Sequence, residues 1–109
     1  EKACFGLSGN PVSSFLQFTL FVAPFLAHLQ GTVPRQRIVP MELGHTFTRK
    51  NGEREGWVPI RIDAQHRVAP IEFHGSAHIH AFTAADGLLA FAPGTTTMDT
   101  GQTALIHLL

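Results

Sequence analysis

The feature that most constrains this chain is a long segment without charged side chains. No Asp, Glu, Lys or Arg lies between Lys2 and Arg35, whereas charges are frequent from Arg35 onward. Within that segment, residues 11–29 would be apolar around nearly the whole circumference of a helix. Such a helix must be buried on most sides or lie in lipid. The contrast predicts two parts with different surroundings, residues 1–32 and residues 33–109.

The helix predicted over residues 11–29 has recognisable ends. Asn10 is a favourable N-cap, Pro11 suits the first helical position, and Gly31 stops the run. Pro24 lies inside the helix and should kink or bend it locally. No basic residue flanks the run closely on its N-terminal side, and it is interrupted by Gln17, Thr19, Pro24 and His28. A core helix whose packing partners lie elsewhere is therefore favoured over a membrane span.

The segment before the helix has the pattern of a strand that turns sharply into it. Residues 3–5 are predicted to end a short buried strand, and Gly6, Gly9 and Pro11 to form the turn. Backbone N–H groups converge at such a turn, with the positive end of the helix dipole behind them. The turn is therefore predicted to attract an anion. Cys4, in the apolar strand, would remain an inert thiol.

From Arg35 onward the apolar residues alternate with the period of two that is typical of strands. Val58, Ile60 and Ile62 share one face, and Pro40 indicates an edge strand or a bulge. Five strands are predicted, at residues 36–43, 57–63, 67–73, 88–92 and 103–109. A hairpin turn is expected at residues 50–52, a short helix at 77–85, and further turns at 63–66, 86–87, 93–94 and 100–101. The expected fold is mostly β, a small barrel or closed sheet.

Composition narrows the classes of partner. Eight basic and eight acidic side chains cancel among 109 residues, so no charge excess favours nucleic acid or an anionic membrane as a partner. Cys4 is the only cysteine, which excludes an internal disulfide and favours a reducing compartment, the cytoplasm.

Residues 5–13, FGLSGNPVS, resemble the FGLPGNPVS motif of the molybdopterin molybdenumtransferases, the MoeA and gephyrin group. Residues 21–24, FVAP, resemble the F-V-x-P element of the helix that follows in that family. Weaker matches follow in family order: EREGW at 53–57, GS at 75–76, ADGL at 85–88 and GQTA at 101–104. The resemblance covers essentially the whole chain. It implies that residues 1–32 are the C-terminal strand and helix of the α/β molybdopterin-binding domain, and residues 33–109 the C-terminal β domain.

This resemblance implies the C-terminal part of an enzyme that inserts molybdate into adenylylated molybdopterin and releases AMP. It also implies a homodimeric parent enzyme that uses Mg²⁺, with the Mg²⁺ ligands outside this chain. The isolated piece is therefore expected to be inactive. Neither a catalytic residue nor a metal ligand is predicted within it.

The matching motifs imply substrate-binding positions in two places. Residues of the glycine turn would line the active cleft, whereas two further residues would handle the oxyanion. Molybdate is a tetrahedral dianion, which suits a guanidinium fork, a hydroxyl donor and backbone amides. Ser8 replaces the first proline of the family motif, and Gly56 intervenes before Trp57, where the family has an aromatic residue directly after the hairpin Glu. The implied positions are Gly6, Ser8, Gly9, Asn10 and Pro11 in the turn, and Arg54 and Ser76 for the oxyanion.

Two non-catalytic functions remain open from the residues alone. His74, His78 and His80 could bind a metal ion, because imidazole is a common ligand and the three would share one face of a strand. Alternatively, the apolar helix could pair with a second copy of the chain through Phe15, Phe18, Phe21 and Phe25.

Overall fold

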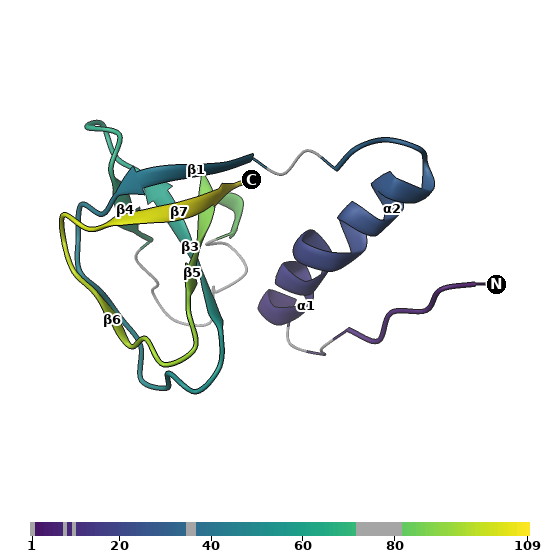
Figure 1. Ribbon diagram of the computed structural model, residues 1–109, viewed down its shortest axis with the longest axis horizontal. Coiled ribbons are helices and arrows are strands. Elements are labelled where there is room, and N and C mark those ends of the chain that lie inside the picture. The colour runs from purple at the N-terminus through teal and green to yellow at the C-terminus, as the bar shows by residue number, and fades with distance from the viewer. Residues whose placement is uncertain (1, 8, 10, 35–36, 72–81) are drawn as a thin grey trace. The chain divides into compact units, whose positions relative to one another are not determined.

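The computed structural model describes residues 2–7, 9, 11–34, 37–71 and 82–109 (Figure 1). The chain divides into two compact units, Glu1–Arg35 and Gln36–Leu109. The first unit contains the helix and the second contains all of the described strands.

The helix of the first unit runs without a break from Pro11 to Leu29, but its middle turn is wider than an α-helix. It consists of α1 (Pro11–Gln17), the π-helical η1 (Phe18–Val22) and α2 (Ala23–Leu29). The backbone N–H of Ala23 donates to the carbonyl of Phe18, five residues earlier. Pro24 has no N–H and its ring crowds the preceding turn. The distortion predicted at Pro24 therefore takes the form of a π-helical turn directly before it.

The helix ends as its sequence predicts. Gly31 has a φ of 73°, a left-handed conformation that glycine adopts without strain. The N–H of Gly31 donates to the carbonyl of His28 at 3.0 Å, and the N–H of Thr32 donates to that of Ala27 at 3.0 Å. The hydroxyl of Thr32 donates to the same Ala27 carbonyl at 2.8 Å. This is a Schellman motif, which satisfies the last carbonyls of the helix.

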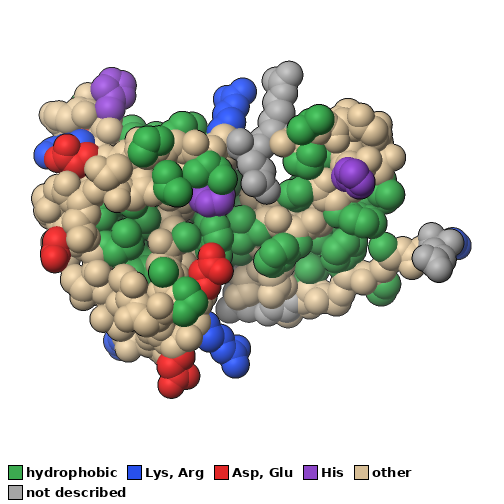
Figure 2. All heavy atoms as spheres, viewed as in Figure 1, with side chains coloured by type: hydrophobic (Ala, Val, Ile, Leu, Met, Phe, Trp, Pro, Cys, Tyr) green, Lys and Arg blue, Asp and Glu red, His purple; other side chains and the backbone are tan. Residues whose placement is uncertain are grey.

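The apolar side chains of the helix are largely uncovered. Phe15 is 40% exposed, Phe21 63% and Leu29 65%, and hydrophobic side chains lie on the surface of the helical unit in Figure 2. Among the residues that the structure describes, no helix is long and apolar enough to cross a membrane.

The strand predicted at residues 3–5 is wrong, because residues 2–7 are exposed and form no strand. A strand is stabilised by hydrogen bonds to a neighbouring strand, and this segment pairs with no strand in the described part of the chain. Phe5 instead contacts Phe25 of α2 edge to face, with ring centroids 5.2 Å apart. Cys4 is accordingly exposed, not buried as expected.

The second unit is built on a five-stranded antiparallel sheet in the order β1-β7-β5-β3-β4, accompanied by a two-stranded ribbon of β2 and β6. The five strands of the sheet correspond to the five predicted segments. Pro40 lies in the edge strand β1, where a missing N–H costs no ladder bond inside the sheet. The bounds are β1 Arg37–Glu42, β2 Phe47–Thr48, β3 Gly56–Ile62, β4 Val68–Pro70, β5 Gly87–Phe91, β6 Thr97–Met98 and β7 Thr103–Leu108.

The sheet curls into a half-barrel (Figure 1), and the segment that follows edge strand β1 meets the opposite edge strand, β4. Leu43, directly after β1, forms a parallel bridge with Val68 of β4. The N–H of Gly44 donates to the Val68 carbonyl at 2.9 Å. The core fills the inside of the curl, with Val58, Ile60 and Ile62 of β3 packed in it as predicted. The expected mostly β, barrel-like fold is therefore confirmed.

The hairpin predicted at residues 50–52 is wrong. β2 pairs with β6, and β3 pairs with β4 and β5, so residues 49–55 connect two different sheets. The turn signal in the sequence is local, whereas the partner of β2 is set by Phe47, which is buried in the core. The turns at 93–94 and 100–101 are confirmed, with φ of 87° at Gly94 and 90° at Gly101. Of the helix predicted at residues 77–85, residues 82–83 are helical and residues 77–81 lie outside the described residues.

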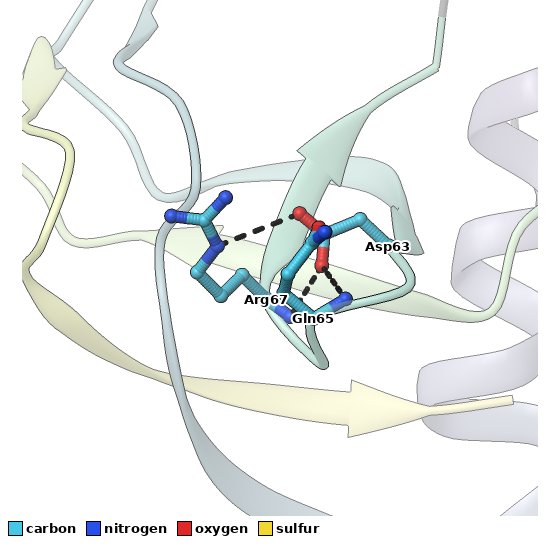
Figure 3. Close-up of polar contacts among 3 residues, drawn as sticks. All are labelled: Asp63, Gln65 and Arg67. Atoms are coloured by element: carbon cyan, nitrogen blue, oxygen red, sulfur yellow. Dashed lines mark hydrogen bonds and ion pairs between the residues drawn. The ribbon is translucent and has the colours of Figure 1, made fainter.

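The turn between β3 and β4 is fixed by Asp63 (Figure 3). Its Oδ1 accepts the N–H groups of Gln65 and Arg67, both at 2.9 Å. Its Oδ2 lies 3.6 Å from Nε of Arg67. The backbone hydrogen bond from Arg67 is the main cause that lowers the pKa of Asp63 below its ordinary value. These contacts account for Asp63 as a turn residue, which the sequence predicts for this position.

Candidate functional site

Arg54, one of the predicted oxyanion-binding residues, lies in the loop of residues 49–55 that leads from β2 to β3. This loop lines an open pocket of about 390 Å³ through Arg49, Asn51, Glu53, Arg54 and Glu55. Arg54 is exposed, and its guanidinium makes no hydrogen bond or ion pair with the described residues. The side chain is therefore available to a ligand that enters this pocket.

Arg49 holds the loop in place through its guanidinium. Its Nε donates to the carbonyl of Thr95 at 2.7 Å, and its Nη1 donates to the carbonyl of Arg54 at 2.6 Å. Its Nη2 donates to the carbonyl of Ala92 at 2.9 Å and, at 3.5 Å, to that of Gly52. The guanidinium also lies over the ring of Phe91, 5.2 Å from its centroid.

The charges around the pocket are mixed. Two guanidiniums, of Arg49 and Arg54, and two carboxylates, of Glu53 and Glu55, line it. Among the described residues no ion pair joins these four side chains. In the part of the chain that the structure describes, every acceptor of Arg49 is a main-chain carbonyl, so no direct contact with a carboxylate neutralises its charge there. The pocket can therefore offer the guanidinium of Arg54 to an anion, although the carboxylates of Glu53 and Glu55 oppose that binding.

Sequence reasoning missed the role of Arg49. An arginine beside an apparent hairpin turn is usually an exposed surface residue, and two of its acceptors lie 43 and 46 residues away. The sequence did contain one indication of this role, because Gly56 departs from the family pattern. A Cβ added to Gly56 would lie 2.5 Å from Nη1 of Arg49, so the glycine leaves the space that this guanidinium fills.

The glycine turn belongs to the first unit. Gly6 and Gly9 have no positive φ, and a Cβ added to either would meet no atom within 4 Å. In the described structure, local sterics therefore do not require a glycine at either position. Pro11 is the first residue of α1, as predicted. The other three predicted site residues, Ser8, Asn10 and Ser76, lie outside the described residues.

The histidine cluster of the metal hypothesis, His74, His78 and His80, also lies outside the described residues. Within the ranges that are described, no group of three or more His, Cys, Asp or Glu side chains could hold a metal ion.

A second, more apolar groove of about 560 Å³ lies beside the first pocket and shares Glu55 with it. Trp57 and His107 pack edge to face in this groove, with ring centroids 4.7 Å apart. Burial lowers the pKa of His107 below its ordinary value, while the carboxylate of Glu55 acts in the opposite direction.

The fold is that of a small half-barrel β domain in a chain that also carries a long apolar helix. Residues 43–109 match the family described as the MoeA C-terminal region (domain IV), so the chain belongs to this family.

Its relatives agree with this assignment. The chain is 30% identical over 110 residues to a protein of Methanocaldococcus jannaschii named as a molybdopterin biosynthesis protein, covering 100% of this chain and 25% of that one. It is 30% identical over 114 residues to the molybdopterin molybdenumtransferase of Haemophilus influenzae, covering 98% of this chain and 28% of that one. The chain thus spans about a quarter of the length of these curated relatives.

The fold also matches solved structures. The molybdopterin biosynthesis MoeA protein of Pyrococcus horikoshii OT3 has a TM-score of 0.78 and 26% sequence identity, over 94% of this chain and 26% of that one. A molybdenum cofactor biosynthesis protein of Pyrococcus furiosus, at 24% identity, shares the fold with a TM-score of 0.75, over 94% of this chain and 36% of that one.

Proposed function

We propose that this chain is the C-terminal part of a molybdopterin molybdenumtransferase, which inserts molybdate into adenylylated molybdopterin and releases AMP. The observation that supports this proposal is the free guanidinium of Arg54 at an open pocket, in a domain of the MoeA family. Because the chain spans about a quarter of its relatives' length, we expect it to need the rest of the enzyme for activity.

In this proposal the oxyanion is bound by residues of the β domain. The planar fork of Arg54 can donate two parallel hydrogen bonds to two oxygens of molybdate, which a tetrahedral dianion accepts well. Ser76 would add a hydroxyl donor. The turn of Gly6, Ser8, Gly9, Asn10 and Pro11 would approach adenylylated molybdopterin, since glycines without side-chain neighbours let a ligand come close to the backbone.

Mg²⁺ has no step in this proposal. The described residues offer no group of carboxylates or imidazoles that fits a metal ion. We propose that the Mg²⁺ ligands lie outside this chain, and we place the parent enzyme in the cytoplasm.

Substitution of Arg54 in the full-length enzyme tests the proposal. Hydrogen bonds to charged groups contribute roughly 1.5–3 kcal/mol, so Arg54→Ala should raise the KM for molybdate about 10- to 100-fold. Arg54→Lys should recover part of this loss, because a lysine restores the charge but not the fork. The assay follows AMP release against molybdate concentration at saturating adenylylated molybdopterin.

The matched control is Arg61→Ala, which removes an exposed guanidinium from β3 outside the pocket. Within the described residues this guanidinium makes one hydrogen bond, to the carbonyl of Pro70, which is long at 3.4 Å. An unchanged KM for molybdate in Arg54→Ala, or an equal change in Arg61→Ala, would argue against oxyanion binding by Arg54.

We further propose that the parent enzyme is a homodimer. The exposed phenylalanines of the helix, Phe15, Phe18 and Phe21, support this, because an apolar surface of this kind favours association. Light scattering on the full-length enzyme measures its mass directly, and a monomeric mass at high concentration would rule out the dimer.

A further inference from the structure

Hydrogen bonds around Arg49 connect two loops of the β domain, residues 49–55 and the connection between β5 and β6. The N–H of Arg49 donates to the carbonyl of Thr96 at 2.9 Å, and the N–H of Gly94 donates to that of Gly52 at 2.6 Å. The Arg49 guanidinium adds donors to carbonyls in both loops, at Gly52 and Arg54 in residues 49–55 and at Ala92 and Thr95 in the β5–β6 connection. The position of the Arg54 main chain is thereby tied to the turn at residues 92–96.

The guanidinium of Arg49 is already committed to the protein. An arginine has five N–H donors, and four donor contacts to carbonyls leave at most one for a ligand. A bidentate grip on an oxyanion is therefore not available to Arg49, in contrast to Arg54. Lysine could not replace it, because a single ammonium group cannot reach acceptors spread around the plane of a guanidinium.

Gly56 makes room for this arrangement. Its nearest neighbours are all atoms of the Arg49 side chain, with Nη1 at 2.5 Å from the site of a Cβ and Cζ at 3.5 Å. An alanine here would displace the flexible end of Arg49, because the three atoms nearest to its Cβ, at 2.5–3.7 Å, all belong to the Arg49 side chain. Gly56→Ala is therefore a second way to move the guanidinium, with the charge of Arg49 retained.

We propose that Arg49 is a positioning residue for oxyanion binding: its guanidinium fixes the carbonyl of Arg54, so that the Arg54 side chain is held at the pocket before molybdate arrives. This inference rests on the proposed function of Arg54. Preorganisation of this kind lowers the cost of ordering a loop on binding, so its loss weakens binding even though the contacting residue is unchanged.

A double-mutant cycle in the full-length enzyme tests the inference. Arg49→Lys and Gly56→Ala are each made in the natural sequence and in the Arg54→Ala background, and KM for molybdate is measured by AMP release. With Arg54 present, each substitution should raise KM by about tenfold, which is less than the roughly 100-fold loss that a full 1 Å misplacement can cause. In the Arg54→Ala background the same substitutions should change KM by less than about twofold, because no side chain remains to be positioned.

Each outcome has a distinct meaning. Equal changes of KM in both backgrounds would show that Arg49 only supports the fold and would overturn the inference. An unchanged KM for Arg49→Lys and Gly56→Ala, with a raised KM for Arg54→Ala, would overturn the inference and leave the proposed function standing. An unchanged KM for Arg54→Ala alone would overturn both. Thermal unfolding identifies a variant that does not fold, and Gly56→Ala carries the test if Arg49→Lys fails.

Discussion

Removal of the two carboxylates that flank Arg54 should strengthen molybdate binding. Glu53 and Glu55 line the same pocket as Arg54, and no ion pair holds either of them within the described residues. Both should therefore repel a dianion bound there. Glu53→Gln and Glu55→Gln remove these charges at nearly constant size, and the N–H of residue 53 can still donate to Oδ1 of Asn51 at 2.9 Å.

The size of the effect follows from the pocket. A sphere of about 390 Å³ has a radius of about 4.5 Å, and the radii of the ligand and wall atoms add about 3 Å, so an anion at its centre lies roughly 8 Å from a carboxylate on the wall. At this distance in water, the repulsion between a unit charge and a dianion is about 1 kcal/mol. A Debye length of about 8 Å at physiological ionic strength reduces it to roughly 0.4 kcal/mol, or about twofold in affinity for each glutamate.

The assay is AMP release by the full-length enzyme against molybdate concentration, at two ionic strengths. The double variant Glu53→Gln/Glu55→Gln should have a KM for molybdate about fourfold lower at 0.15 M salt, and roughly fifteenfold lower at 0.01 M, where the Debye length is about 30 Å. Glu42→Gln, an exposed position on β1 outside the pocket, is the matched control. A KM that stays constant or rises in the double variant would refute the electrostatic reasoning and the location of the anion.

Two further predictions concern the β domain itself. The pKa of His107 should lie below its ordinary value of 6.5, and Glu55→Gln should lower it further because the attraction of the carboxylate is lost. NMR titration of the imidazole measures both pKa values. A higher pKa in Glu55→Gln would show that the Glu55 carboxylate does not attract the imidazole. Since the folded state holds His107 more weakly protonated than the unfolded state, its contribution to stability is present above pH 6.5 and is lost as the pH falls from there through the lowered pKa. Gly87→Ala should destabilise the domain by about 1–3 kcal/mol, because a Cβ there would lie 2.8 Å from Cγ2 of Ile106 and 2.9 Å from the carbonyl oxygen of His107. Thermal unfolding measures this loss against Gly6→Ala, whose Cβ meets no atom within 4 Å and whose unfolding midpoint should not change.

The helix and the five sheet strands were predictable because their signals are local. Apolar periodicity, a proline at the first helical position and Gly31 at the end are read within a few residues of the element that they define. The ribbon of β2 and β6 was not predictable in this way, because strands of two residues have no periodicity. Residues 50–52 misled for a related reason, since turn chemistry does not specify which strands pair.

In the candidate site, too, local features were predictable from the sequence and long-range contacts were not. A family motif could indicate Arg54, because the chemistry of a free guanidinium belongs to the residue itself. The role of Arg49 depends on carbonyls of Ala92 and Thr95, which no local pattern connects to it. Gly56 is visible in the sequence as a departure from the family pattern, but only the structure explains it. Nη1 of Arg49 lies 2.5 Å from the position that a Cβ of residue 56 would take. Since the Arg49 guanidinium needs the space that Gly56 leaves, a relative with a side chain at the position of Gly56 must lack the arginine or hold its guanidinium in a different place.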